Sequence, residues 1–184
     1  MFYITQEFNA AIEVKRSKFV AHLCPYNEFD ALQNRLKEEH PKARHFVYAY
    51  RYLNEYDQIV ENSSDDGEPK GTSGKPSLKA LFGADMINTG VIVVRYFGGT
   101  MLGTGGLVRA YSDAVNEVVG IAQKHQFEKL VTREITLSYS DLAKTEYTLA
   151  QLGIHIKEKY FDDNVKLILE ATGERFDAYD KELA

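Results

Sequence analysis

The chain has 184 residues, of which 44% are hydrophobic and 27% are charged, and its formal net charge is −5. This composition excludes fibrous, disordered and membrane-spanning classes and leaves a globular protein with one good core or two modest ones. The acidic balance also excludes a nucleic-acid binder that is basic over its whole surface, although it allows a local basic patch.

The N-terminus and the cysteine content both favour the cytoplasm. No basic stretch followed by an apolar one marks the N-terminus for secretion. The single cysteine, Cys24, excludes an intrachain disulfide and a cysteine-rich zinc site, and it fits a reducing compartment. We expect Cys24 to be a buried small hydrophobic residue at the end of a strand.

The first expected element lies in residues 11–24, which are rich in β-branched and aromatic residues. This pattern predicts a strand, or a bent pair of strands, closed by Pro25. Strand alternation would place Arg16 and Lys18 on one face and Lys15 on the other, so these three do not form a single basic surface.

A helix and a strongly aromatic strand are expected next. We expect Asn27 to cap the helix and Pro41 to end it. In residues 45–52, four aromatic side chains alternate with other residues and therefore share one face of a strand. These are Phe46, Tyr48, Tyr50 and Tyr52.

Two glycine-rich loops separate the following elements. Residues 62–75 form a long turn-forming segment, and Pro76 is expected to open a short helix that ends at Gly83. The uninterrupted Val/Ile run in residues 90–96 predicts a strand covered on both faces. The second loop, residues 97–106, leads directly into a long helix with apolar residues at helical spacing.

The pattern beyond residue 125 has the order β-α-β-β-α, with a turn at residues 162–164 between the last two strands. This order predicts a ferredoxin-like unit without its last strand. Either the pattern ends early or the chain is shortened at its C-terminus. In both cases the strand around Ile135 is expected to be a bare edge, open to pairing.

The second loop matches no strict nucleotide-binding motif. Thr104 and Gly105 stand where a P-loop needs lysine and a hydroxyl residue, and Val108 replaces the last glycine of the dinucleotide pattern. A glycine-rich turn before a long helix, with Arg95 before it and Arg109 one turn into it, still predicts an anion site for a phosphate. The competing interpretation is that these glycines serve backbone packing alone.

No catalytic or metal residue is predicted. We expect Asp65, Asp66 and Glu68 to accept hydrogen bonds from turn N–H groups rather than to hold a cation, since no second carboxylate cluster or histidine pattern accompanies them. His45 is a candidate base for a hydroxyl nucleophile, but no spacing supports a hydrolase. The candidate hydroxyls are those of Ser63, Ser64, Thr72 and Ser73.

Two segments together carry a family resemblance: DDGEPKGTSGKP at 65–76 and VIVVRYFGGTMLGTGGLVRAY at 91–111. They resemble the signature of the Impact family, which includes the bacterial YigZ-type proteins. The segments SKFVA and HFVYAY also resemble the family's N-terminal part. The resemblance is strong over residues 1–125 and weaker over residues 126–184.

The resemblance implies an α+β fold with two domains. An Impact-type N-terminal domain at 1–125 would be an α/β sandwich like the second domain of a small-subunit ribosomal protein. This fold is shared by elongation factor G and by small-molecule kinases of the galactokinase type. A ferredoxin-like βαββα domain at 130–184, without its last strand, would resemble the last domain of elongation factor G.

The resemblance also implies a binding surface formed by the two loops. By position it includes Asp65, Asp66, Gly67, Glu68, Pro69, Gly71, Thr72, Gly74, Arg95, Gly98, Gly99, Gly103 and Arg109. Gly105 and Gly106 of the second loop complete the predicted site. We expect the loops to meet at one end of the N-terminal sheet, where helix-terminus N–H groups, Arg95 and Arg109 would receive a phosphate.

Family members are regarded as regulatory or nucleic-acid-binding proteins without established catalysis. This implies a cytoplasmic, non-enzymatic regulator of translation whose partner is RNA, the ribosome or a translation factor. We expect no cofactor, no membrane association and no sequence-specific DNA binding. Two alternatives stay open: an enzyme acting on a phosphorylated small molecule or nucleotide, and a purely protein-binding adaptor, which the acidic C-terminal third would suit.

Overall fold

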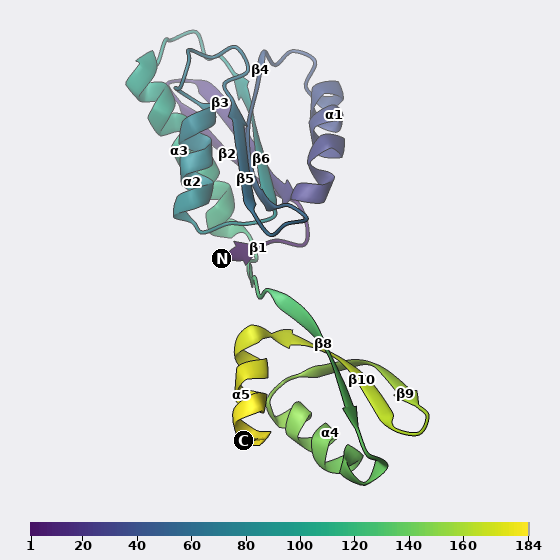
Figure 1. The fold of residues 1–184 in the computed structure, drawn as a ribbon. Helices are drawn as coiled ribbons and strands as arrows, with labels where there is room; N and C mark the ends of the chain where they lie inside the picture. Colours follow the sequence, from purple (N-terminus) through teal and green to yellow (C-terminus); the bar gives the residue numbers. More distant parts are fainter. Residues whose placement is uncertain (184) are drawn as a thin grey trace. The chain divides into compact units, whose positions relative to one another are not determined.

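The computed structural model describes residues 1–183, and the chain divides into two compact units, Met1–Phe127 and Glu128–Ala184 (Figure 1). Each unit has its own sheet, helices and hydrophobic core. The chain is therefore an α+β protein of two domains, as the sequence predicts. Among the described residues, no helix combines the length and the apolar character needed to span a bilayer.

The N-terminal unit is built on a five-stranded sheet in which every neighbouring pair of strands is antiparallel. In spatial order the strands are β2 (Phe8–Val14), β3 (Ser17–Pro25), β6 (Thr89–Tyr96), β4 (His45–Leu53) and β5 (Ile59–Ser64). A second, two-stranded sheet pairs β1 (Phe2–Tyr3) with β7 (His125–Gln126).

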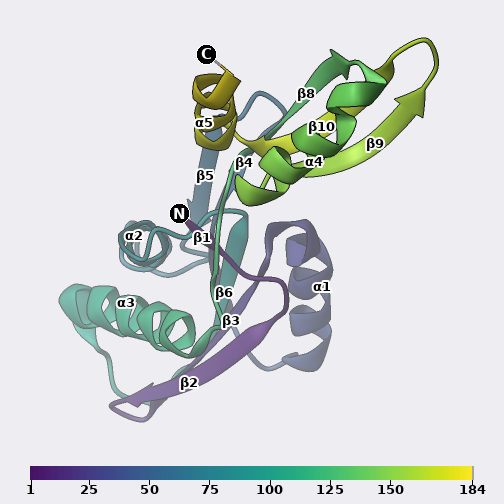
Figure 2. The same ribbon diagram turned by 90° about the horizontal axis from the view of Figure 1, so that it is seen from below.

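Helices cover both faces of the five-stranded sheet (Figure 2). Helix α1 (Phe29–Glu39), preceded by the 3-10 turn η1 (Tyr26–Glu28), lies on one face. Helices α2 (Gly74–Gly83) and α3 (Gly103–Ile121) lie on the other. The long helix after the second glycine-rich loop is thus confirmed.

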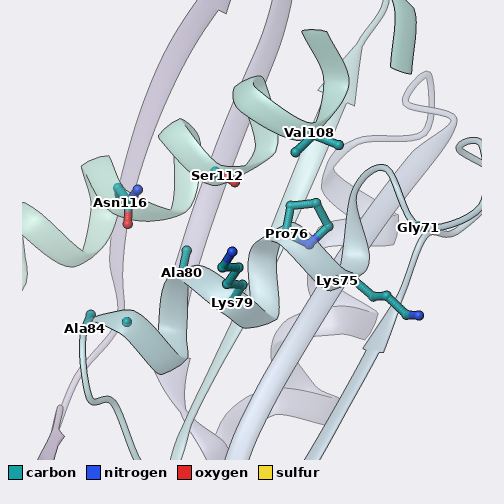
Figure 3. Close-up of a pocket in the computed structure, with 10 residues that line it drawn as sticks. Gly71, Lys75, Pro76, Lys79, Ala80, Ala84, Val108, Ser112 and Asn116 are labelled. Carbon is teal, nitrogen blue, oxygen red and sulfur yellow. The ribbon is translucent and has the colours of Figure 1, made fainter. Parts of the chain in front are cut away.

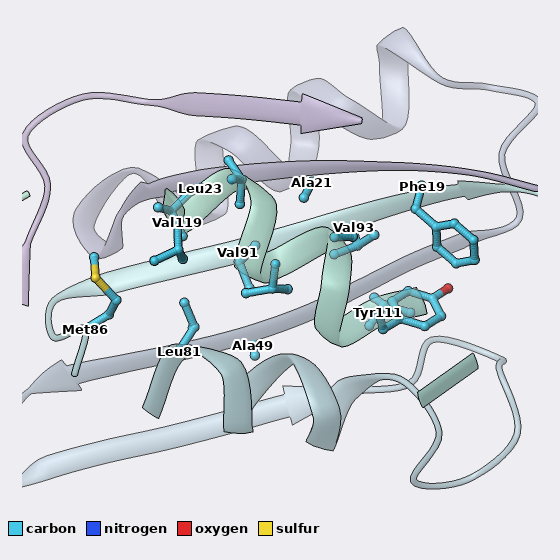
Figure 4. Packing of buried hydrophobic residues seen from close by; sticks show 14 of the residues in the cluster. Phe19, Ala21, Leu23, Ala49, Leu81, Met86, Val91, Val93, Tyr111 and Val119 are labelled. Atoms are coloured by element: carbon cyan, nitrogen blue, oxygen red, sulfur yellow. The ribbon is translucent and has the colours of Figure 1, made fainter. Parts of the chain in front are cut away.

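Strand β6 is buried on both faces, as its continuous apolar run predicts. Val91 and Val93 belong to the core under α2 and α3, whereas Ile92 and Val94 belong to the core under α1. Figure 4 shows the first of these cores, in which the Tyr111 ring packs edge-on against Phe19 with 5.1 Å between ring centroids. Because β6 is the central strand, the loop that follows it starts from the middle of the sheet.

Cys24 is buried in the core under α1, as expected. Burial, together with the nearby Glu7 carboxylate, raises the pKa of the Cys24 thiol to about 12. The thiol therefore stays protonated at neutral pH and behaves as a small hydrophobic group.

The basic cluster near residue 16 differs from its prediction. Residues 11–24 take part in a hairpin, and Lys15 and Arg16 form its two-residue turn with φ angles of 47° and 65°. Strand alternation does not apply to residues in such a turn, so the predicted opposite faces of Lys15 and Arg16 are wrong.

Three predicted boundaries also shift. Asn27 lies within η1 and does not cap α1, whose N-cap position is taken by Glu28 because the chain first makes a 3-10 turn. The loop predicted for residues 62–75 is shorter, since β5 continues its pairing with β4 up to Ser64 and α2 begins at Gly74. Pro76 is the third residue of α2 and not its first.

The C-terminal unit confirms the predicted β-α-β-β-α order. Its elements are β8 (Leu130–Leu137), the 3-10 turn η2 (Tyr139–Asp141), α4 (Leu142–Gln151), β9 (His155–Phe161), β10 (Val165–Thr172) and α5 (Gly173–Leu183). The antiparallel sheet has the order β8-β10-β9, so β8, which contains Ile135, is an edge strand. This is the strand order of a ferredoxin-like unit with three of its four strands.

Candidate anion-binding site

The structure brings the two glycine-rich loops together. Loop one, residues 65–73, connects β5 to α2, and loop two, residues 97–102, connects β6 to α3. Glu68 and Pro69 of loop one line the same cavity as Phe97 and Met101 of loop two. The two loops therefore meet near the C-terminal end of β6.

Asp65 orders loop one. Its carboxylate accepts hydrogen bonds from the backbone N–H groups of Gly71 (2.7 Å), Ser73 (3.1 Å) and Gly74 (2.8 Å), and from the Ser73 hydroxyl (2.9 Å). Burial alone would raise the pKa of Asp65, but these donors together lower it below its ordinary value. This confirms the prediction for Asp65, whereas the expectation that Glu68 accepts from turn N–H groups is wrong, because its carboxylate accepts from the side chains of Arg95 and Tyr111.

Asp66 holds loop one against the start of β4. Its Oδ2 accepts from the Phe46 N–H at 2.7 Å, and its carbonyl oxygen lies 2.8 Å from His45 Nδ1. His45 is thus beside the loop, but its hydrogen bond goes to the backbone. The hydroxyls of Thr72 and Ser73 donate to the Pro69 carbonyl and to Asp65, so neither is paired with His45.

Glu68, Arg95 and Tyr111 form a buried polar cluster between loop one, β6 and α3. Arg95 Nη1 lies 2.5 Å from Glu68 Oε1, and the Tyr111 hydroxyl donates to the same oxygen at 2.8 Å. Burial, reinforced by the Glu68 carboxylate, raises the pKa of Tyr111 well above its ordinary value, so the hydroxyl stays a donor. Arg95 is 7% exposed, and its buried Nε has no hydrogen-bond partner among residues 1–183.

Two glycines are required by close packing of the chain. A Cβ on Gly98 would lie 2.0 Å from the backbone of Arg16, where loop two crosses the β2–β3 turn, and the Gly98 N–H donates to Ser17 Oγ at 3.1 Å. A Cβ on Gly74 would lie 2.7 Å from the backbone of Ser64. Side chains are excluded at both points, which fixes the path of each loop.

A basic cavity of about 410 Å³ opens beside this cluster. Three of its lining side chains, Lys42, Arg44 and His45, come from the segment before β4 and the start of that strand. Arg95, Tyr96 and Phe97 complete the lining, which contains no carboxylate. A cavity of this composition attracts anions, and phosphate most directly.

A second, mainly apolar cavity of about 270 Å³ adjoins the first, and the two share Arg95 and Phe97. Its lining consists of Glu68, Pro69, Arg95, Phe97, Met101, Leu102, Gly103, Thr104 and Leu107. The first turn of α3 therefore forms one wall of this apolar cavity.

A larger groove of about 690 Å³ lies between α2 and α3 (Figure 3). Gly71, Lys75 and Lys79 are among its lining residues, and Val108 and Ser112 face it from α3. Both lysines are exposed, and no buried charged group reaches the groove. We therefore place the candidate site at the two smaller cavities around Arg95.

The predicted residues converge only in part. Arg95 and Glu68 belong to the cluster, but Arg109 is exposed on α3 and lines neither of the two cavities around Arg95. Asp65, Asp66, Gly71, Thr72 and Gly74 support loop one through the contacts above. Gly67, Gly98, Gly99, Gly105 and Gly106 contribute backbone to the loops and to the first turn of α3.

The sequence analysis missed four residues of the site. Three of them line the cavities, namely Lys42, Arg44 and Phe97, and Tyr111 donates a hydrogen bond to Glu68. Lys42, Arg44 and His45 stand together just before the aromatic strand, which is a local basic signal. That signal could have been found. The proximity of these residues to Arg95 could not be predicted, because it depends on the pairing of β4 with β6.

Comparisons with known proteins agree with this architecture. Residues 15–119 match the family model described as "Impact N-terminal domain", and residues 135–184 match "Domain of unknown function (DUF1949)". An "IMPACT family member" of Haemophilus influenzae is 33% identical over 93% of this chain and 84% of the relative. "IMPACT family member YigZ" of Escherichia coli is 37% identical over 76% of this chain and 70% of the relative.

A solved structure also resembles the whole chain. It is titled "Crystal structure of an hypothetical protein", is 30% identical, and covers 100% of this chain and 90% of its own, with a TM-score of 0.67. The function of the site must be inferred from the chemistry of its own residues.

Proposed function

The chain belongs to the Impact family, and from this membership and the geometry of the basic cavity we propose that it is a regulatory protein of the translation apparatus that acts by binding RNA. It works in the cytoplasm and by binding rather than by catalysis. The family resemblance implies domains like those of a small-subunit ribosomal protein and of elongation factor G, and this supports the link to translation.

One observation carries the RNA proposal: the basic cavity holds Lys42, Arg44 and His45 with no carboxylate in its lining. Arg95 also lines this cavity, but its guanidinium is held by Glu68. The flexible lysine and the forked guanidinium of Arg44 are suited to successive phosphates of a nucleic-acid backbone.

The phosphate receptor in this proposal differs from the one expected from the sequence. Arg95 is held by Glu68, so its charge is already balanced inside the protein. Arg109 is exposed on α3 and lines neither of the two cavities. Lys42 and Arg44 therefore take the role that the sequence suggested for Arg95 and Arg109.

Fluorescence anisotropy with a labelled single-stranded RNA at several salt concentrations tests this proposal. Affinity should fall linearly with salt on logarithmic axes, and each lost phosphate contact should reduce the slope by about 0.7. Lys42→Ala and Arg44→Ala should each reduce the slope. Lys79→Ala in the groove between α2 and α3 removes the same charge elsewhere on this unit and should leave the slope unchanged.

Absence of binding at low salt would contradict the RNA proposal and point to a protein partner. Equal effects of Lys79→Ala and Arg44→Ala would contradict the location of the site. Thermal stabilisation by a free nucleotide with magnesium, but not by RNA, would instead favour the enzyme alternative.

A further inference from the structure

The apolar cavity beside the basic one is open to a flat ligand. Phe97 is 60% exposed and Met101 is 84% exposed, and both line this cavity. Large apolar side chains on a loop expose surface that a ligand can cover, and an exposed aromatic ring is a stacking surface. Phe97 also lines the basic cavity, so a ligand stacked on its ring would lie at the boundary between the two.

Glu68 contributes a carboxylate to the lining of the apolar cavity. Glu68 Oε1 accepts hydrogen bonds from Arg95 Nη1 and from the Tyr111 hydroxyl, and these two donors together occupy that oxygen. Glu68 Oε2 has no hydrogen-bond partner among residues 1–183, and it is not completely shielded from solvent. Oε2 is therefore an acceptor that a ligand in the cavity can reach.

The size of the cavity limits the ligand. Its volume of about 270 Å³ lies just below the range typical of drug-sized ligands, which favours a single ring system. A ring in this cavity and an anion in the basic cavity would be neighbours, because Arg95 and Phe97 line both. A nucleotide unit has this combination of a planar ring and an adjoining phosphate.

We propose that the apolar cavity receives one unpaired nucleobase of a bound RNA strand, stacked on Phe97, while the adjoining phosphate occupies the basic cavity. This inference rests on the proposed RNA-binding function and specifies the form of RNA that is bound. Protein recognition of RNA commonly stacks unpaired bases on aromatic side chains and reads their edges by hydrogen bonds.

The Glu68 acceptor selects among bases. Guanine offers two adjacent donors, N1–H and N2–H, to a carboxylate oxygen, whereas the single N3–H donor of uracil is flanked by two carbonyl acceptors. Between these two bases, guanine is the one that the cavity favours. An aliphatic or phenyl side chain of a protein partner would cover Oε2 without supplying any donor, which is unfavourable.

Three labelled octanucleotides with the same number of phosphates test the inference: oligouridine, the same strand with one central guanosine, and the same strand with an abasic site at that position. The guanosine strand should bind about tenfold more tightly than the abasic strand, within the range known for stacking of one base. Phe97→Ala should remove this difference and leave the salt slope unchanged, because the phosphate contacts are the same.

Tyr56→Ala serves as the matched control, since Tyr56 is 73% exposed and lies outside both cavities. It should retain the preference for guanosine. Equal affinity of all three strands, with the salt slope still dependent on Lys42 and Arg44, would overturn the base pocket and leave RNA binding intact. No binding of any strand at low salt would overturn the proposed function itself.

Discussion

Loop one and loop two meet at Arg95, but the first is held by its own side chains and the second is not. In residues 65–73, Asp65, Asp66 and Glu68 direct their carboxylates to backbone N–H groups or to Arg95. In residues 97–102, the ring of Phe97 and the side chain of Met101 are mostly exposed. Loop one is thus held by internal hydrogen bonds, whereas loop two has large side chains that are exposed to solvent.

This difference predicts that the side chains of loop one contribute to stability, whereas the exposed side chains of loop two contribute to binding. Substitutions in loop one should lower the free energy of unfolding, because each removes contacts inside the protein. Exposed side chains in loop two should matter for binding alone. The exception is Gly98, where loop two passes directly over the β2–β3 turn.

Glu68→Ala should have the largest effect on the free energy of unfolding. It leaves the Arg95 guanidinium buried without its partner, which costs about 3–5 kcal/mol. Urea unfolding followed by tyrosine fluorescence measures this loss. The double variant Glu68→Leu/Arg95→Met, which removes both charges, should recover much of it. A loss below 1 kcal/mol in the single variant would show that the pair is not needed.

Gly98→Ala and Gly99→Ala form a matched pair in loop two. The added methyl at Gly98 would collide with the backbone of Arg16, and relieving the collision should cost about 3 kcal/mol. Gly99 has a φ of +84° but nothing within 4 Å of an added Cβ, so its cost is about 1–2 kcal/mol. Thermal unfolding compares the two, and equal losses would contradict the close crossing.

Asp65→Asn should lower the free energy of unfolding by about 2 kcal/mol at neutral pH, since charge-assisted hydrogen bonds become neutral ones. The folded-state pKa of Asp65 lies below its unfolded value, so its contribution is complete above about pH 4 and disappears as the pH falls further. Denaturation curves between pH 7 and pH 3 measure this. A constant difference between wild type and Asp65→Asn across that range would contradict it.

Met101→Ala should have the smallest effect on stability, within about 0.5 kcal/mol, because the side chain is 84% exposed. Its binding of the guanosine strand should nevertheless weaken. Thermal unfolding and anisotropy on the same sample separate the two effects. A loss of stability of 2 kcal/mol or more would show that loop two is held by packing, as loop one is held by hydrogen bonds.

The elements that follow from local pattern could be predicted from the sequence. The apolar run around Ile92 and the helical spacing around Val115 need only the periodicity of strands and helices. A pair of strands in residues 11–24 was one of the two predicted forms, but the position of its turn at Lys15–Arg16 was missed, because the turn places two non-glycine residues at positive φ, which no composition signal marks. Alternation then assigned faces to residues that are not in a strand.

The candidate site could be predicted only to the level of its loops. The Asp65 hydrogen bonds are local and follow from turn chemistry. The pairing of Glu68 with Arg95 and Tyr111 joins three elements distant in sequence, and it changes Arg95 from an expected phosphate ligand to a buried ion pair. The basic cavity likewise depends on the register of β4 against β6, which sets His45 opposite Arg95.

The most direct test of the account is the salt dependence of RNA binding by the double variant Lys42→Ala/Arg44→Ala compared with Lys79→Ala. We predict that the double variant loses about 1.4 from the logarithmic slope, which corresponds to two phosphate contacts on a single strand, while Lys79→Ala keeps the wild-type slope. Identical slopes for the double variant and the wild type would contradict a phosphate site at the basic cavity.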